Sequence, residues 1–362
     1  MRIQIHDKHQ NPRAAVVGAA VGNSFVDNVP DRSLAGLSGR SLFRRRIVRI
    51  AGLVCLAFFG CEQRPREAER SPAQPIIVLT TCQPVLEMAR SAAGESRTRL
   101  QIESAVPATV SSRHWAVDRE QAARLQTAQR IFLHGAGYEP WKDRVTLARS
   151  RVVDTASDYY DRFIRVPDVV THRHGPEGAH SHPGTVWATW LDPQLALLQF
   201  QRIQTELGRL SPDDAQAIQQ NSADWQLRLE QLEADVQDLR RLTHDRQIQV
   251  LGDGPWYQYL VARLDLPLMY LHWPDTGDTL SELDCNELLA MLNETTVNES
   301  TLFLVRTELA DAARPLLEGQ PIQLVPMDLT ELPSDDNRTV LDRWEENIRH
   351  LDAAIRNQGQ GP

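Results

Sequence analysis

Short apolar runs rich in β-branched residues alternate with helical stretches along most of the chain. In the first half we expect strands at 76–80, 100–104, 130–134 and 151–154, and helices from about Pro84, at 118–128 and at 193–208. In the second half we expect strands at 248–252, 266–272, 301–305 and 322–327, and helices at 255–264, 279–292, 307–317 and 338–355. Strands that alternate with helices form parallel sheets with helices on their faces, so the pattern predicts an α/β fold.

One long helical segment separates the two halves. Residues 211–214 (SPDD) supply a serine N-cap, a proline for the first helical position and two aspartates for the positive helix end. Apolar residues then recur at a helical period, and no Gly or Pro interrupts 213–241. We therefore expect one rigid helix, roughly 45 Å long, within a linker at 211–245. It would join a lobe at 76–210 to a lobe at 246–357; a helical hairpin with an unmarked break is the alternative.

Several metal-ligand types follow the expected strands. Ligands of open α/β sheets bind beyond the carboxyl ends of the strands, and two lobes leave a cleft there. Each of these residues alone is more often a cap or a turn residue, but together they predict a cation site in the cleft. They are Cys82, His134, Asp154, Asp253, Arg306 and Asp328.

Four of the eleven histidines fall within residues 171–182, THRHGPEGAHSH, where a Gly-Pro-Glu-Gly turn separates two pairs. These are His172, His174, His180 and His182. Neutral imidazole is a common zinc ligand, and His-x-His in extended chain puts both rings on one side. The segment lacks the ligand spacing of a closed structural zinc site, so we expect a loop that captures metal loosely. A solvated polar loop is the alternative.

The first 75 residues resemble an export signal and a tether. Five arginines within 40–49 precede the apolar run 50–60, which is too short to span a membrane as a stable helix. Residues 1–60 therefore form a signal region, which an over-extended gene start would lengthen. Cys61 follows a loose lipobox, so we expect it to carry a lipid anchor; an ordinary secretory signal or a short anchor is the alternative. Residues 61–75 form a polar tether.

Charge and cysteine content narrow the classes of partner. Residues 1–60 hold 9 of the 39 basic and 3 of the 48 acidic residues, so the remainder has a formal charge of −15. This argues against nucleic acid and anionic membrane surfaces as partners, and it favours cations. Cys82 and Cys285 do not make a disulfide scaffold, and the sequence leaves open whether they pair.

Three segments carry a family resemblance: HGPEGAHSH followed by TWLDP (189–193), LHGAGYEPW (133–141) and PWYQYLVARL (255–264). Over about residues 75–355 the chain resembles the zinc- and manganese-binding substrate-binding lipoproteins of bacterial ABC transporters. The resemblance implies two α/β lobes linked by a long rigid helix, with the metal held between them by three histidines and a carboxylate. It also implies Zn (or Mn) as the transported ligand, a permease with its ATPase as partner, and a monomer anchored on the periplasmic side of a membrane.

The residues aligned with the family's ligands differ. Arg113, with His114 beside it, stands at the first histidine position, and Ala188 and Gly254 stand at the others. Asp328 matches the carboxylate. Either tight metal binding is lost, or loop histidines such as His180 or His182 complete a rebuilt site. The other donors of that rebuilt site would be His114, His134, Asp253 and Asp328.

We expect a binding protein that delivers Zn²⁺ or Mn²⁺ to a membrane permease. The alternative is a metal-buffering or adhesion lipoprotein that kept the frame and lost the tight site. A metallohydrolase is disfavoured, because the sequence has neither a His-Glu-x-x-His helix nor a nucleophile elbow. We therefore expect no enzyme.

Overall fold

The computed structural model covers the body of the chain, within one compact unit at Glu67–Pro362. The expected signal region, Cys61 and residues 61–73 of the tether lie outside the described residues. In the described part, no helix combines the length and the apolar character that crossing a membrane requires. The described residues are 74–94, 99–173, 179–274, 280–295, 297–298, 300–306 and 311–358, with the backbone alone at 167–173 and 179–183.

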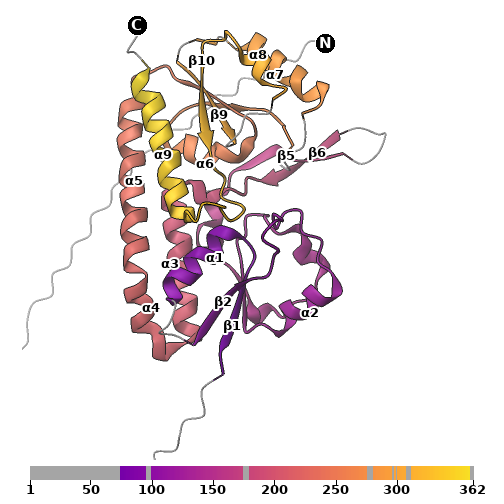
Figure 1. Ribbon diagram of the computed structural model, residues 1–362, viewed down its shortest axis with the longest axis vertical. Helices are drawn as coiled ribbons and strands as arrows, with labels where there is room; N and C mark the ends of the chain where they lie inside the picture. The colour runs from indigo at the N-terminus through magenta and orange to yellow at the C-terminus, as the bar shows by residue number, and fades with distance from the viewer. Residues whose placement is uncertain are drawn as a thin grey trace, which may run out of the picture. The chain divides into compact units, whose positions relative to one another are not determined.

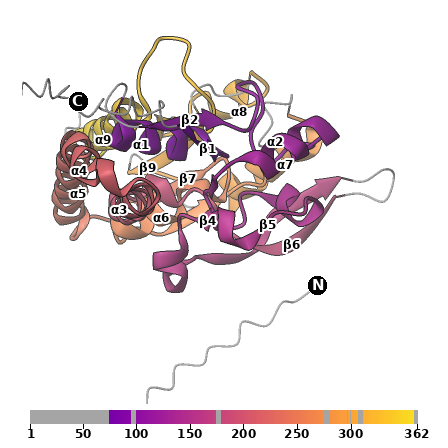
Figure 2. The same cartoon turned by 90° about the horizontal axis from the view of Figure 1, so that it is seen from below.

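The first lobe contains a parallel sheet of four strands in the order β2-β1-β3-β4. Successive side chains of a strand point to opposite faces, and the core clusters follow this rule. Val78 packs with the residues of α1 and α3, and Leu79 packs with Leu125 of α2. Figure 2 shows α1 and α3 on one side of β1 and α2 on the other. The elements are β1 (Ile76–Thr80), α1 (Gln83–Ala93), β2 (Leu100–Ser104), α2 (Arg119–Thr127), β3 (Arg130–Leu133), β4 (Val152–Asp154) and α3 (Pro193–Leu210).

The second lobe repeats the arrangement with the order β10-β9-β7-β8, also parallel. Along β9, Leu302 and Leu304 belong to the core that includes α9, and Phe303 and Val305 belong to the core that includes α7. The predicted α/β fold of two lobes with parallel sheets is confirmed. The elements are β7 (Gln249–Gly252), α6 (Gln258–Arg263), β8 (Leu268–Tyr270), α7 (Glu282–Glu294), β9 (Thr301–Arg306), α8 (Arg314–Leu317), β10 (Ile322–Met327) and α9 (Val340–Asn357).

The histidine-rich segment lies in a β-hairpin, seen in Figure 1 between the two lobes. Strands β5 (Arg165–Arg173) and β6 (Ala179–Thr185) pair antiparallel, with a register shift between Val166 and Val170. The expectation of an irregular loop over this region was wrong for these residues. The reason is in the sequence: the β-branched residues of β5 favour a strand, and glycines that follow such a run favour a hairpin. Residues 174–178, including His174, lie outside the described residues.

The linking segment is not one helix. It consists of a 3₁₀ turn at Pro212–Asp214, helix α4 (Ala215–Asn221) and helix α5 (Ala223–Thr243). The Ser222 hydroxyl donates to the carbonyl of Ile218 at 2.7 Å, and such back-bonding bends helices. The expected break-free helix was therefore wrong, and α5 alone, roughly 32 Å long, joins the lobes. Figure 1 shows α5 beside α3 in one lobe and α9 in the other.

Two leucines of α5 test whether its buried stripe holds the lobes on one spine. Leu229 is 0% exposed and Leu227 is 66% exposed. We expect Leu229→Ala to lower the free energy of unfolding by about 2–5 kcal/mol, because it leaves a cavity in the core. The matched control Leu227→Ala should change it by less than about 0.5 kcal/mol. Urea unfolding measures both, and equal losses would mean that α5 is not packed as described.

Candidate functional site

His134 follows β3 at the carboxyl end of the first sheet and is fully buried. Its Nε2 lies 2.8 Å from the carbonyl oxygen of Trp187, and its Nδ1 lies 2.9 Å from the side-chain amide nitrogen of Gln199. A carbonyl only accepts, so Nε2 carries the proton and Nδ1 accepts from Gln199. Burial lowers the pKa of His134 to about 3. The ring is therefore neutral, and both of its nitrogens are hydrogen-bonded within the protein.

A buried carboxylate, Glu139, fixes the turn around His134. It accepts from the backbone N–H groups of His134 and Gly135 at 2.6 and 3.1 Å, and from the Thr81 hydroxyl at 2.6 Å. Burial raises the pKa of Glu139 to about 7. The turn has positive φ at Gly135 and Ala136, which the carboxylate stabilises by satisfying its donors. Sequence reasoning did not identify Glu139; its signal was the Gly-Ala-Gly turn that begins two residues after β3 and shortly precedes Glu139.

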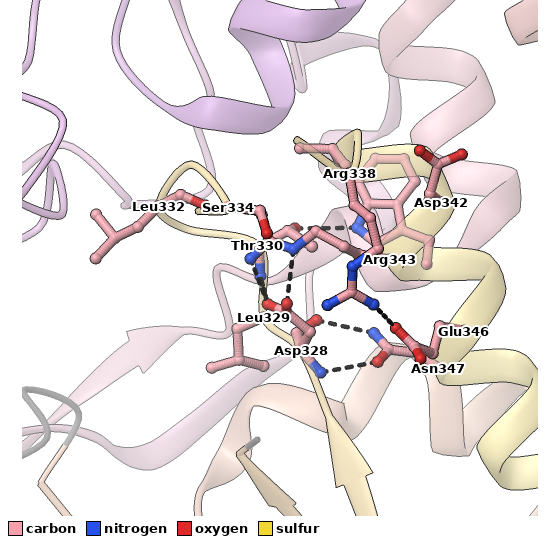
Figure 3. Close-up of polar contacts among 12 residues, drawn as sticks. Asp328, Leu329, Thr330, Leu332, Ser334, Arg338, Asp342, Arg343, Glu346 and Asn347 are labelled. Carbon is pink, nitrogen blue, oxygen red and sulfur yellow. Dashed lines mark hydrogen bonds and ion pairs between the residues drawn. The ribbon is translucent and has the colours of Figure 1, made fainter. Parts of the chain in front are cut away.

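Asp328 follows β10 and forms a two-pronged ion pair with Arg343 of α9 (Figure 3). Nε and Nη2 of Arg343 each donate to one carboxylate oxygen at 2.6 Å. The N–H of Thr330 donates to Oδ1 at 2.8 Å, and the Asn347 amide binds both backbone groups of Asp328. Arg343 is buried, so the charge of Asp328 is neutralised inside the protein. The carboxylate that matched the family's ligand thus has a resident cation.

Asp253 follows β7 and is paired in a similar way. One of its oxygens accepts from the Tyr257 hydroxyl at 2.9 Å. The other accepts from the backbone N–H and the Nε of Arg306, at 2.9 and 3.2 Å. These bonds tie the end of β9 to the 3₁₀ turn Pro255–Tyr257. Asp253 is buried, and its role in this geometry is to hold the backbone.

The remaining candidate ligands lie apart. His114 is exposed in the turn that follows Ser111. In the hairpin backbone, His172 stands opposite His180, and Val170 stands opposite His182. Cys82 is buried and Cys285 half-buried, and both are free thiols, so they do not pair. Burial raises the pKa of Cys82.

Among the described side chains, no group of three or more His, Cys, Asp and Glu could hold a metal ion. A rebuilt cleft site from His114, His134, Asp253 and Asp328 stays a prediction. The structure gives His134, Asp253 and Asp328 polar partners within the protein, and the side chain of His114 is exposed. None of the first three can bind metal without losing a hydrogen bond.

An aromatic cluster occupies the junction between the lobes. Trp187 precedes the 3₁₀ turn Thr189–Leu191 of the first lobe, and Trp256 lies in the turn that follows β7 of the second. Their ring centroids are 5.3 Å apart, with a tilt of 38°. The guanidinium carbon of Arg113 lies 4.8 Å from the centroid of Trp187 and 5.4 Å from that of Trp256. Sequence reasoning treated Arg113 only as a replaced ligand; the signal for its role was a tryptophan within two residues of each of the other two replaced positions.

Hydrogen bonds also cross the junction. Glu331 of the second lobe accepts from the hydroxyls of Ser111 and Tyr138 at 2.8 and 2.9 Å. The Trp190 indole N–H donates to the carbonyl of Leu329 at 3.0 Å, and the Tyr259 hydroxyl donates to the carbonyl of Val186 at 3.0 Å. The lobes therefore contact each other directly, beyond their connection through α5.

One comparison with known proteins identifies the family of the chain, and another finds similar folds. The model of the family described as the periplasmic component A of zinc-uptake complexes matches residues 78–354. No curated protein matches the chain. Among solved structures, the Zn(II)-bound ZnuA-like domain of AdcA from Streptococcus pneumoniae is 17% identical with a TM-score of 0.61, over 79% of this chain and 100% of that one. FpvC from Pseudomonas aeruginosa in complex with Mn²⁺ is 16% identical with a TM-score of 0.62, over 79% and 99%. The metal-dependent lipoprotein YcdH from Bacillus subtilis is 15% identical with a TM-score of 0.59, over 78% and 98%.

The lowered pKa of His134 predicts a pH-dependent loss of stability. The unfolded chain protonates this ring below about pH 6.5, and the folded protein does so only near pH 3. The contribution of neutral His134 is therefore full above pH 6.5 and is lost as the pH falls toward 3. We expect the stability advantage of wild type over His134→Asn to shrink by up to about 1.4 kcal/mol per pH unit in this window.

Urea unfolding of both proteins at pH 8, 7, 6 and 5 measures this difference. Between pH 8 and 7 the difference should stay constant, because neither the folded nor the unfolded state protonates the ring there. A difference that also stays constant down to pH 5 would show that the ring takes up a proton in the folded protein.

Proposed function

Because the chain belongs to the family of periplasmic A components of zinc-uptake complexes, we propose that it captures zinc, or manganese as second choice, for an ABC importer. The family is a substrate-binding component of transport and not an enzyme. Two similar structures support a transition metal as cargo: the AdcA domain is Zn(II)-bound, and FpvC has been solved with Mn²⁺ and with Ni²⁺. The partner of the protein would be a permease with its ATPase.

We place the capture of metal on the hairpin β5–β6. The observation that carries this placement is the backbone register, in which His172 stands opposite His180. Residues directly opposite in an antiparallel pair have Cβ atoms about 4.5–5.5 Å apart, and zinc takes imidazole nitrogen at about 2.0–2.1 Å. Two cross-strand histidines are thus near enough to share one ion. His174 and His182 would supply further donors from the same hairpin.

The hairpin suits loose capture rather than a closed cage. Its strands contact each other as a two-stranded sheet, separate from the two parallel sheets. The acidic body, with a formal charge of −15 beyond residue 60, attracts cations toward it. A second arrangement, in the cleft, would use His114, His134, Asp253 and Asp328, but it would have to displace the internal partners of three of them.

The export and the boundaries of the parts are also proposals. A signal region at 1–60 would direct the chain out of the cytoplasm, and a lipid on Cys61 would anchor it by the tether 61–75. Lobes at 76–210 and 246–357, with the linker 211–245 between them, would form the monomeric body. The sequence layout supports these assignments: arginines, then a short apolar run, then the cysteine.

A second function is favoured by the paired carboxylates. Asp253 and Asp328 each bind an arginine side chain, and Arg113 stands at the lobe junction. A protein that kept the family's frame and lost a tight metal site would have these features. It would buffer metal or serve in adhesion at the cell surface instead of delivering cargo.

Zinc titration calorimetry on residues 62–362 tests the placement of the metal. We expect the double variant His172→Asn, His180→Asn to weaken zinc binding at least tenfold, about 1.4 kcal/mol, because it removes both cross-strand donors. The matched control His244→Asn, which removes an exposed histidine elsewhere, should bind as wild type does. Binding should also weaken below about pH 6.5, since imidazole must be neutral to bind metal.

Two other outcomes would contradict parts of this proposal. Zinc affinity that is unchanged in the double variant would move the metal off this histidine pair. No zinc or manganese binding by the wild-type protein would favour the second function.

A further inference from the structure

We propose that Arg113 is a built-in cation that holds the two lobes together through Trp187 and Trp256, so that the junction closes without metal and excludes a divalent ion. The inference stands on the junction alone and does not depend on metal capture by the hairpin. It identifies three residues that determine what the cleft accepts.

The guanidinium of Arg113 contacts a tryptophan ring from each lobe. Arg113 and Trp187 belong to the first lobe, and Trp256 belongs to the second. A guanidinium within about 6 Å of an indole centroid is attracted to the ring face, and more strongly when the pair is shielded from water. Both centroids meet this limit, at 4.8 and 5.4 Å, and both tryptophans are buried. One cation thus attracts an aromatic ring from each lobe.

Trp187 and Trp256 are held by contacts of their rings and not by hydrogen bonds of their indole N–H groups. Neither the Trp187 nor the Trp256 indole N–H has a hydrogen-bond partner among the described residues, although both atoms are buried. A buried donor without an acceptor costs free energy. The contacts of the ring faces, with each other and with the guanidinium, must offset this cost.

The Trp256 ring lies so close to the backbone at Gly254 that no side chain fits there. A Cβ atom added at Gly254 would lie 2.2 Å from Nε1 and 2.3 Å from Cε2 of Trp256, so any side chain there would displace the ring. Ala188, next to Trp187, is fully buried. An imidazole at Gly254 would require the Trp256 ring to move. Gly254 is therefore a packing requirement of the aromatic pair.

The nearby carboxylates already have cationic partners. The two carboxylates that the sequence places near the cleft are each bound to an arginine, Asp253 to Arg306 and Asp328 to Arg343. A divalent ion that used one of these carboxylates would have to take it from its arginine. This raises the free energy of a bound metal. The junction is therefore built for a guanidinium.

Hydrogen exchange at the junction tests this inference on the purified, exported form of the chain. In wild type with chelator, the amides of 186–189, Gly254, Trp256 and Tyr257 should be protected, and added zinc should leave their rates unchanged. Arg113→Met should speed their exchange by about 5- to 30-fold, which corresponds to a shielded cation–π contact. The matched control Arg130→Met removes a half-buried arginine of the same lobe and should stay within about twofold of wild type.

Two results would overturn the inference. One is a wild-type junction that exchanges rapidly until zinc is added. The other is an Arg113→Met variant that exchanges as the control does. If Arg113→Met fails to fold, Arg113→Lys replaces it: the charge remains and the planar group is lost, so partial loss of protection is expected, and wild-type protection would contradict the stacking.

The same experiment separates this inference from the proposed function. The hairpin variant His172→Asn, His180→Asn should leave the junction rates at their wild-type values, whether or not it binds zinc. If zinc binding is absent in every protein, the exchange rates of the Arg113 variants still decide the role of the guanidinium. A hairpin variant with a loosened junction would contradict the independence of the two regions.

Discussion

A charge that a fold removes from water must find its partner inside the protein, and this constraint shapes the whole region between the lobes. Strands of both sheets end there, and buried polar residues follow some of them, among them His134 and Asp253. Asp328 is balanced by Arg343 and Asp253 by Arg306. Glu139 gathers three donors around a strained turn. Arginine side chains supply the positive charge beside Asp253 and Asp328.

The consequence is a separation of two tasks. Junction contacts such as Tyr138–Glu331 and Tyr259–Val186, with the spine of α5, hold the lobes in place. On our proposal, Arg113 completes this closure and the hairpin histidines contact the cargo. Closure would then carry no information about whether metal is bound. Recognition by a permease would depend on the hairpin or on the protein's permanent closed form.

Sequence reasoning predicted the fold well, because sheet strands are local apolar runs and their alternation with helices fixes the parallel topology. It missed the break at Ser222, since a serine within a helical pattern is not a strong stop signal. The metal site stays a prediction, and the sequence did not reveal the internal partners of its residues. Asp328 and Arg343 are fifteen residues apart and meet only through the packing of α9. The sequence predicted His134 as a ligand. In the structure its ring is buried, and its two nitrogens are hydrogen-bonded to Trp187 and Gln199. From the sequence, Gly254 was only the position of a missing histidine. The structure gives the reason for the glycine, because a side chain there would clash with the Trp256 ring.

The most direct test of the central claim is anomalous scattering at the zinc absorption edge from crystals of the protein grown with zinc. We predict no zinc peak at the lobe junction, where the guanidinium of Arg113 lies against both Trp187 and Trp256, and a peak beside His172 and His180 wherever zinc is bound. A zinc peak at the lobe junction, with Arg113 displaced from the tryptophans, would contradict both the built-in cation and the separation of closure from capture.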